Sequence, residues 1–396
     1  MNQKRLITKV VLLVSFVSLF NDIASEMLYP IMPVFLRSIG FTIAWIGILE
    51  GVAEATAGLS KGYFGNLSDR MGRRLPFIQF GYVLSALSKP LMVVFVHPLW
   101  IFFVRTTDRL AKGIRTSARD AILSDEATPG TKGKVFGFHR ALDTVGASIG
   151  PVLALLFLWM RPGDYKLLFI IAFIPGMIAV LLTLFIKEKR HAYKPTTGKG
   201  FFAYLGYWKR APREYKLLVA GLLFFALMNS SDAFLLLALK AVGYSDTYMI
   251  GFYIFYNLAF AILAFPAGML ADRIGLRSMV VIGLIIFAIV YSMMGFVHGI
   301  MGFGILFLFY GFYAASTEGI SKAWITNVAE KNEIATAIGF YSSMLSIATL
   351  ISSSMAGLLW LLFGMKVMFL ISGIGALIAG VYLMAIPLKK IYAQKV

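Results

Sequence analysis

The ten residues 65–74, GNLSDRMGRR, recur in altered form at residues 268–277, GMLADRIGLR. Six positions match at a constant offset of 203, the distance from Gly65 to Gly268. The matched residues are Gly65, Leu67, Asp69, Arg70, Gly72 and Arg74 in the first copy, and Gly268, Leu270, Asp272, Arg273, Gly275 and Arg277 in the second. The offset is close to half of the 396-residue chain. Self-similarity at a fixed spacing indicates a repeated structural unit, so the sequence predicts two related halves.

The composition around this repeat is typical of a membrane protein. The chain is 59% hydrophobic and only 14% charged, whereas about a quarter of the residues in a soluble domain are charged. A soluble fold would need one very large core with little polar surface to cover it. We therefore predict an integral membrane protein.

Runs of about 20 apolar residues, separated by Gly, Pro or charged residues, predict twelve helical spans. The expected spans are 7–37, 42–64, 75–95, 99–122, 134–158, 166–186, 217–239, 247–270, 278–297, 301–325, 334–362 and 367–387. The segment 187–216 is polar and basic, which is typical of a linker. The predicted fold class is an all-α membrane protein with two pseudo-symmetric six-helix bundles, residues 1–186 and 217–396.

The net charge of +18 is distributed as in a polytopic membrane protein. The basic residues cluster in short segments between apolar runs, including Lys4, Arg5, Arg70, Arg73, Arg74, Lys389, Lys390 and the many lysines and arginines of 187–216. This is the positive-inside pattern, and it predicts that both termini and the linker face the cytoplasm. Nucleic-acid binding is the weaker explanation of the charge.

Several function classes find no support in the sequence. The chain has no cysteine, four histidines and no spacing typical of metal ligands, so we expect no metal and no cofactor. A phosphate-binding GxxxxGK[ST] loop is absent, which argues against an ATP-driven pump. There is neither a nucleophile–base arrangement nor a soluble signalling module, so an enzyme or a membrane sensor is not expected. The first apolar run contains Asn21, Asp22 and Glu26 and predicts a retained helix, not a removable signal peptide.

Local motifs resemble those of the major facilitator superfamily. The repeated GNLSDRMGRR loop resembles motif A, and RLAKGI at 109–114 resembles motif B with Lys112 where the family usually has Gln. GASIGP at 146–151, with Gly146, Gly150 and Pro151, resembles motif C of the antiporter branches. Pro30 and Pro33 in the first span resemble the Pro-x-x-Pro pattern of proton-coupled drug exporters. The stretches FNDIASEMLYPIMPVFL at 20–36 and GFHRALDTVGASIGP at 137–151 are similar to a little-studied prokaryotic branch of the superfamily. The resemblance implies a secondary transporter that works by rocker-switch alternating access.

The motif A loops suggest a gate. Asp69 follows the end of a predicted span, where its carboxylate can reach the N-terminus of a neighbouring helix or a basic side chain. Gly65 and Gly72 permit close backbone approach and a tight turn. The alternative is that Arg70, Arg73 and Arg74 only fix the orientation of the chain beside anionic lipid.

Charged residues concentrate in the first predicted bundle. In the span 99–122, seven charged residues fall within an arc of roughly 140° on one helix face. A charge left in lipid costs about 3 kcal/mol, so this face is expected to look into protein or water. Arg115 and Arg119 lie nearer the predicted cytoplasmic end, where we expect a solvated or lipid-facing arginine. The predicted coupling and substrate residues are Asp22, Glu26, Glu50, Glu54, Arg105, Asp108, Arg109, Lys112, Arg140 and Asp143, with Asp232 and Glu318 from the second half.

Three interpretations of these charges remain open. The ions are fixed salt bridges; or a carboxylate opposite Arg109 changes protonation during transport, with Asp22, Glu26 and Asp143 as the preferred proton carriers; or the cations bind an anionic substrate. We favour proton-coupled efflux of a small amphipathic or organic solute, with transport of an organic anion as the alternative. The expected partners are that solute, protons and the lipid bilayer of the inner (cytoplasmic) membrane, and we expect a monomer.

Overall fold

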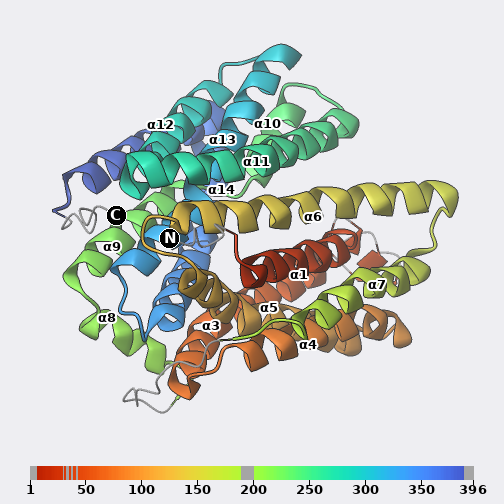
Figure 1. Cartoon of the computed structure of the whole chain (residues 1–396). Coiled ribbons are helices and arrows are strands. Elements are labelled where there is room, and N and C mark those ends of the chain that lie inside the picture. Colours follow the sequence, from red (N-terminus) through yellow and green to blue (C-terminus); the bar gives the residue numbers. More distant parts are fainter. Residues whose placement is uncertain are drawn as a thin grey trace. The chain divides into compact units, whose positions relative to one another are not determined.

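The computed structural model describes residues 7–29, 31–32, 35–36, 39–41, 43–188 and 200–387, and this part of the chain is helical with no strand (Figure 1). The longer helices are α1 (Lys9–Glu26), α3 (Ile43–Met71), α4 (Leu75–Val94), α5 (Pro98–Glu126), α6 (Lys132–Met160), α7 (Tyr165–Thr183), α9 (Arg213–Met228), α10 (Ala233–Ala241), α11 (Asp246–Ile274), α12 (Leu276–Met294), α13 (Ile300–Val328) and α14 (Ile334–Ala385). Two short elements, η1 (Ala203–Gly206) and α8 (Tyr207–Arg210), precede α9.

The helices form two compact units, and each unit takes a segment from the other half of the sequence. Unit 1 contains residues 1–126, 142–209 and 331–343, and unit 2 contains 127–141, 210–330 and 344–396. The first residues of α6 therefore belong to unit 2, and the first residues of α14 belong to unit 1. The predicted bundles, residues 1–186 and 217–396, stay a prediction. The two units are not continuous in sequence, so they cannot be matched to these bundles directly.

In unit 1, α5 packs between α3 and α4, and α7 packs against α1 and α4 (Figure 1). The apolar core of this unit includes Leu36, Ile101, Leu168 and Ala172, which have no exposed surface. In unit 2, α13 packs between α11 and α12. Its buried interior is rich in aromatic rings, among them Phe287, Tyr291 and Phe303 with no exposed surface.

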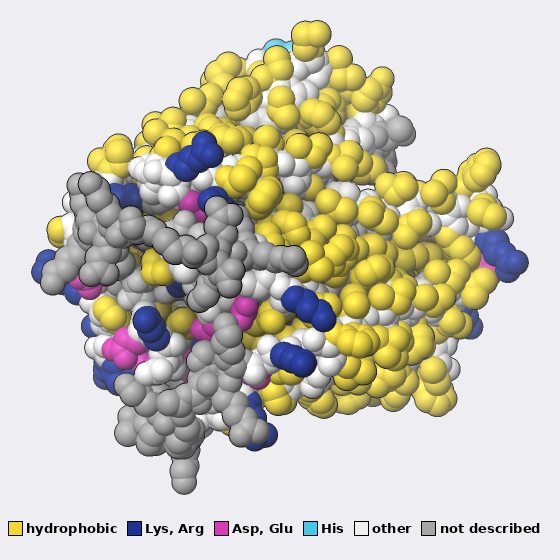
Figure 2. Space-filling model, viewed as in Figure 1, with side chains coloured by type: hydrophobic (Ala, Val, Ile, Leu, Met, Phe, Trp, Pro, Cys, Tyr) yellow, Lys and Arg dark blue, Asp and Glu magenta, His cyan; other side chains and the backbone are white. Residues whose placement is uncertain are grey.

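Each of the twelve predicted spans falls on a described helix or part of one. Eight described helices are long and apolar enough to cross a membrane: α4, α6, α7, the pair α9–α10, α11, α12, α13 and α14. The helices α1, α3 and α5, which carry most of the predicted charged site, are not among these eight. The visible surface is mostly hydrophobic (Figure 2), and side chains such as Trp159, Met301 and Leu361 are about four-fifths exposed, at 82%, 79% and 80%. Such a surface is suited to contact with lipid.

The repeated motif ends a helix and turns the chain in both copies. Asp69 and Arg70 lie in the last turn of α3, and Asp272 and Arg273 lie in the last turn of α11, so the motif is more helical than the loop we expected. Gly72 (φ 62°) and Gly275 (φ 98°) have positive φ at equivalent positions. An L-residue with a side chain is strained there, which explains why the repeat keeps glycine.

Two further departures from regular helix occur in the second half. The predicted span 217–239 is divided: α9 ends at Met228 and α10 begins at Ala233. The intervening residues Asn229, Ser230, Ser231 and Asp232 are all of types that favour turns, but they lie between two apolar runs that together have the length of one span, and we did not predict a break there. In α14, Gly364 has φ 83° and ψ 167°, which are non-helical values. It falls between the last two predicted spans, as expected from the sequence.

Part of the sequence-based expectation lies outside the described residues. Residues 189–199 of the predicted linker fall there, as do Lys4, Arg5, Pro30, Pro33, Lys389 and Lys390. The described end of the linker packs through aromatic rings. Trp208 stacks on Phe340 with ring centroids 5.6 Å apart, and Tyr63 stacks on Phe201 at 5.1 Å.

Candidate functional site

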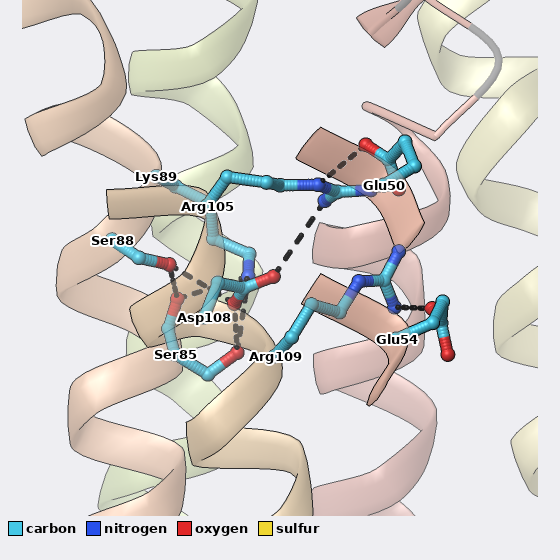
Figure 3. A network of polar contacts seen from close by, with 8 residues as sticks. All are labelled: Glu50, Glu54, Ser85, Ser88, Lys89, Arg105, Asp108 and Arg109. Carbon is cyan, nitrogen blue, oxygen red and sulfur yellow. Dashed lines mark hydrogen bonds and ion pairs between the residues drawn. The ribbon is translucent and has the colours of Figure 1, made fainter. Parts of the chain in front are cut away.

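A buried carboxylate on α5 is the centre of a polar network in unit 1 (Figure 3). The Oδ1 atom of Asp108 accepts hydrogen bonds from Ser85 Oγ at 2.7 Å and Ser88 Oγ at 3.0 Å, and Lys89 Nζ lies 3.3 Å away. These three partners come from α4. The Lys89 side chain is 3% exposed and its ammonium also donates to the Ser85 carbonyl at 2.9 Å. Because every group is bonded, this part of the network can hold two buried charges without an orphaned ion.

The same face of α5 binds two glutamates of α3. Arg105 donates from Nε to Glu50 Oε1 at 2.8 Å and from Nη2 to Oε2 at 2.9 Å, a bidentate pair. Arg109 Nη1 lies 3.3 Å from Glu54 Oε1, and Figure 3 shows the two ion pairs one above the other. The Glu54 side chain is 59% exposed, while that of Arg109 is 10% exposed. This second pair is therefore the more accessible of the two.

The network balances its own charge. Glu50, Glu54 and Asp108 face Arg105, Arg109 and Lys89, three acids and three bases. Glu50, Glu54, Arg105, Asp108 and Arg109 were all predicted site residues, but their pairing was not predicted. Lys89 was not identified as the partner of Asp108 either, because hydropathy gives no information on which neighbouring helix faces which.

A second polar cluster in unit 1 joins α1, α5 and α6. The carboxyl groups of Asp22 on α1 and Asp143 on α6 are close enough for their charges to interact. Arg119 Nη1 lies 3.7 Å from Asp143 Oδ1, and Arg119 also donates to Asp120 Oδ1 at 3.0 Å and to Ser18 Oγ at 2.7 Å.

The expectation that Arg115 and Arg119 are solvated or lipid-facing is wrong. Arg115 is 5% exposed and its guanidinium lies 4.7 Å from the centroid of the Tyr82 ring. The side chain of Arg119 is 11% exposed and bonded as described above. Arg115 contacts Tyr82 on α4, and Arg119 contacts Asp143 on α6 and Ser18 on α1. The spacing of charged residues along α5 does not predict these partners, because they lie on other helices.

The glycines that resemble motif C bring α6 close to α1. A Cβ on Gly146 would lie 2.4 Å from the Leu19 carbonyl oxygen, and one on Gly150 would lie 2.8 Å from that of Ile23. Asp22 lies between these two contacts on α1. The close approach therefore positions the Asp22–Asp143 pair, and Pro151 interrupts the α6 hydrogen bonding just beyond it.

Glu26 and Lys112 lie between the two clusters. Charge interactions from Lys112, Arg109 and Asp143 act on Glu26. Lys112 is exposed, unlike its neighbours Ala111 and Gly113 on α5. These two residues are the predicted site residues of the first half with no side-chain contact described above.

Three further predicted site residues lie in unit 2: Arg140 from the first half of the sequence, and Asp232 and Glu318 from the second half. Arg140 of α6 forms an ion pair with Glu318 of α13, and its guanidinium lies 5.2 Å from the centroid of the Phe260 ring. Asp232, directly before α10, accepts a hydrogen bond from Tyr310 Oη at 2.6 Å. The charges of Glu318 and Arg140 both act on Asp232, so the three charged residues form one neighbourhood.

The two motif A aspartates make equivalent contacts with helix N-termini. In unit 1, Asp69 Oδ2 accepts from Thr336 N at 2.7 Å and Thr336 Oγ1 at 2.9 Å, at the start of α14. In unit 2, Asp272 accepts from Gly133 N at 2.8 Å and Lys134 N at 2.9 Å, at the start of α6. A carboxylate is stabilised there by free N–H groups and by the helix dipole.

The basic residues of the motif differ between the copies. Arg74 pairs with Asp69 at 3.1 Å and with Asp125. Glu188, which the sequence analysis did not single out, accepts from the backbone N–H groups of Arg74 and Leu75 at the start of α4. Arg70 and Arg277 are half-buried and Arg273 is exposed.

These features define the class of the protein. Membrane helices in two repeated halves, with charged side chains held inside, are typical of a secondary transporter. Among the described residues, no group of three or more His, Asp or Glu side chains is placed to hold a metal ion.

The chain belongs to the major facilitator superfamily, whose family model matches residues 14–256 and 249–395. It is 33% identical over 390 residues to an uncharacterized MFS-type transporter of Methanocaldococcus jannaschii, covering 96% of each chain. It is 23% identical over 172 residues to the quinolone resistance protein NorA of Staphylococcus aureus, covering 43% of this chain and 42% of that one. The crystal structure of the human organic anion transporter MFSD10 has a TM-score of 0.80 at 17% identity, covering 94% of this chain and 98% of that chain.

Proposed function

We propose that this multi-pass membrane transporter exports a small amphipathic or organic solute from the cytoplasm in exchange for protons. The observation that carries the proposal is the Asp22–Asp143 pair beside Arg119. Movement of α1 against α6 changes the distance between the two carboxyl groups and between Asp143 and the guanidinium. Since an adjacent cation favours the ionised carboxylate and an adjacent carboxylate favours the protonated form, such movement loads and releases a proton.

The two motif A contacts supply a reversible latch for this movement. Asp69 and Asp272 each hold the first turn of a helix by hydrogen bonds and not by apolar packing alone. Releasing them costs a few charge-assisted hydrogen bonds. In this proposal the latches close one access route and open with the opposite one.

The proposed direction and location are supported by a partial relative and by the charge pattern. NorA, matched over part of the chain, is a quinolone resistance protein, which supports export of an organic compound. We place the chain in the cytoplasmic membrane as a monomer, with both termini inside, because the basic clusters follow the positive-inside pattern. Membership of a transporter family supports transport over catalysis.

A second candidate function is transport of an organic anion. Arg109 Nε is buried without a hydrogen-bond partner, and its partner Glu54 is largely exposed. Lys112 on the same helix is exposed. A carboxylate or phosphate that displaced Glu54 would gain a guanidinium and an ammonium as partners.

The proposal is tested by flux in proteoliposomes across a compound library, with and without an imposed pH gradient. We expect the wild type to concentrate at least one compound in response to the gradient. Asp22→Asn and Asp143→Asn should retain exchange of that compound but lose the response to pH. If no imposed proton gradient changes the flux of any transported compound, proton coupling is refuted.

Two further variants separate the alternatives. The first is Arg109→Ala. If this variant folds and transports like the wild type, the ion pairs of α5 are fixed salt bridges with no role in coupling. Arg105→Ala should weaken transport of an anion far more than that of its neutral analogue if the anion alternative is correct. Equal effects on both compounds would argue against it.

A further inference from the structure

The break between α9 and α10 is a polar site inside the hydrophobic second half. Residues 229–232 leave the helix, and tyrosines from two other helices bind them. Asn229 Nδ2 donates to Tyr313 Oη at 3.0 Å, and Ser230 Oγ lies 3.4 Å from Tyr291 Oη. Non-helical backbone at membrane depth persists only where protein or a cavity satisfies it, and such discontinuous helices mark solute sites in transporters.

Asp232 is the charged group of this break, and among the described residues no basic side chain pairs with it directly. In the described part of the chain, Asp232 forms no ion pair within 4 Å, and Tyr310 Oη is its hydrogen-bond donor at 2.6 Å. The residue is only half-buried, so a ligand can reach it. The nearby Arg140 pairs with Glu318 of α13.

The surroundings of Asp232 are aromatic. The rings of Tyr256 and Tyr310 have centroids 5.0 Å apart, and those of Tyr310 and Tyr313 are 5.2 Å apart. The Phe260 ring already lies against one cation, the Arg140 guanidinium. Aromatic faces attract cations, most strongly where water is excluded. The break lies between the C-terminal end of α9 at Met228 and the N-terminal end of α10 at Ala233, so the two helix dipoles oppose each other there.

The contrast with unit 1 decides the charge of the ligand. There, Glu50, Glu54, Asp108 and Asp143 each have a basic partner within 4 Å, and the charge of Lys112 acts on both Asp22 and Glu26. A positively charged solute would have to displace one of these cations, whereas Asp232 offers a carboxylate with no basic partner to displace. We propose that unit 2 binds an organic cation, a positively charged nitrogen or phosphorus centre on an apolar body, with Asp232 as its counter-ion and Tyr256 and Tyr310 beside it. This inference rests on the proposed function, because it identifies the bound cation with the transported solute.

The test uses two probes that differ in the sign of their charge. Tetraphenylphosphonium and tetraphenylborate have nearly the same size and shape. Equilibrium binding of each is measured to the full-length protein in nanodiscs without any ion gradient, with empty nanodiscs subtracted. We expect saturable binding of the phosphonium that is at least about 10-fold tighter than that of the borate, because a charged pair is lost with the anion.

Variants locate the site. Asp232→Asn should weaken phosphonium binding at least about 10-fold, Asp232→Glu should restore part of it, and Tyr310→Phe should weaken it less than Asp232→Asn. Glu330→Gln removes an exposed carboxylate at the end of α13 and should leave binding unchanged. Thermal unfolding of each variant establishes that it is folded.

Three results would overturn the inference: no saturable phosphonium binding to the wild type, equal affinity for the borate, or unchanged affinity in folded Asp232→Asn. Failure of the proposed function has a different signature. If the cation binds as described but its flux ignores an imposed pH gradient, proton coupling fails while the cation site stands.

Discussion

At the scale of single residues, Asp108 shows how this protein holds charge away from water. One carboxylate oxygen gathers two serine hydroxyls and the Lys89 ammonium, all from α4. A buried ion pair adds little net stability compared with a well-packed apolar pair, but removal of one partner is costly because the other charge is left unpaired. The effect of mutation at this site therefore depends on what happens to the partner.

We predict that Asp108→Asn lowers the stability of the protein by about 3–5 kcal/mol, since it leaves Lys89 buried without a counter-ion. The double variant Lys89→Met with Asp108→Leu should recover most of the loss. Thermal unfolding of the purified protein measures both. Glu330→Gln, which removes an exposed carboxylate, is the control. A single variant as stable as the wild type would show that Lys89 loses its charge at little cost.

At the scale of helices, glycine sets the distance between crossing elements. A Cβ on Gly65 of α3 would lie 2.4 Å from the Ala335 carbonyl oxygen on α14, and one on Gly268 of α11 would lie 2.2 Å from that of Gly133 on α6. The two contacts occupy equivalent positions of the repeat. The same helices carry other glycines, Gly51 and Gly251, with no atom within 4 Å of an added Cβ.

This difference gives a matched prediction within each helix. Gly65→Ala and Gly268→Ala should each destabilise the protein by about 1–3 kcal/mol through overpacking against backbone that cannot move aside. Gly51→Ala and Gly251→Ala should be neutral or stabilising by up to about 1 kcal/mol, because alanine favours helix over glycine. Unfolding midpoints of the four variants test this, and equal effects within either helix would contradict the role of close approach.

The two aspartate caps lead to a prediction about local opening. Asp69→Asn removes the charge that binds the first turn of α14, and Asp272→Asn does the same for α6. Loss of a helix cap costs about 1 kcal/mol, so amide hydrogen exchange in the affected first turn should accelerate roughly fivefold. Each variant is the control for the other, because the helix whose capping aspartate is unchanged should keep its wild-type exchange rate. Acceleration at both helix starts in either variant would mean that the caps are not local.

Elements differ in how far the sequence predicts them. The apolar runs predicted every described span, and Gly364 and the motif A glycines marked their turns. The break at 229–232 was missed although Asn, Ser and Asp favour turns, because the apolar runs on both sides have the combined length of one span. The tyrosines on α12 and α13 that stabilise the break are far away in the sequence, so they could not be identified as its partners. For the same reason the sequence grouped Asp22, Glu26 and Asp143 as candidates but did not show that Arg119 reaches Asp143. It also did not connect Glu188 to the start of α4. Helical spacing gives the face of a helix, whereas the partner depends on the packing of whole helices.

At the scale of the whole molecule, the two units do not coincide with the two halves of the sequence. Residues 331–343 belong to unit 1 and residues 127–141 belong to unit 2. The exchanged segments carry the glycine contacts and the capped helix starts: Ala335 and Thr336 contact α3, and Gly133 and Lys134 contact α11. A repeat that would be self-contained by sequence is therefore incomplete without thirteen to fifteen residues of the other repeat.

This exchange predicts that neither half is stable alone. A fragment of residues 1–209 lacks the segment that contacts Gly65 and Asp69, and a fragment of residues 210–396 lacks the segment that contacts Gly268 and Asp272. Each exposes a helix face with a closely packed glycine and an aspartate that has lost its contact with a helix N-terminus, so we expect each fragment to aggregate or be degraded when it is expressed separately. Expressed together, the fragments should co-purify and unfold at a temperature near that of the intact chain. Gly65→Ala and Gly268→Ala in the paired fragments should reduce the yield of the complex more than Gly51→Ala and Gly251→Ala do. Recovery of either fragment alone as a monodisperse, cooperatively unfolding protein would show that the sequence halves are the folding units and that the exchanged segments dock later.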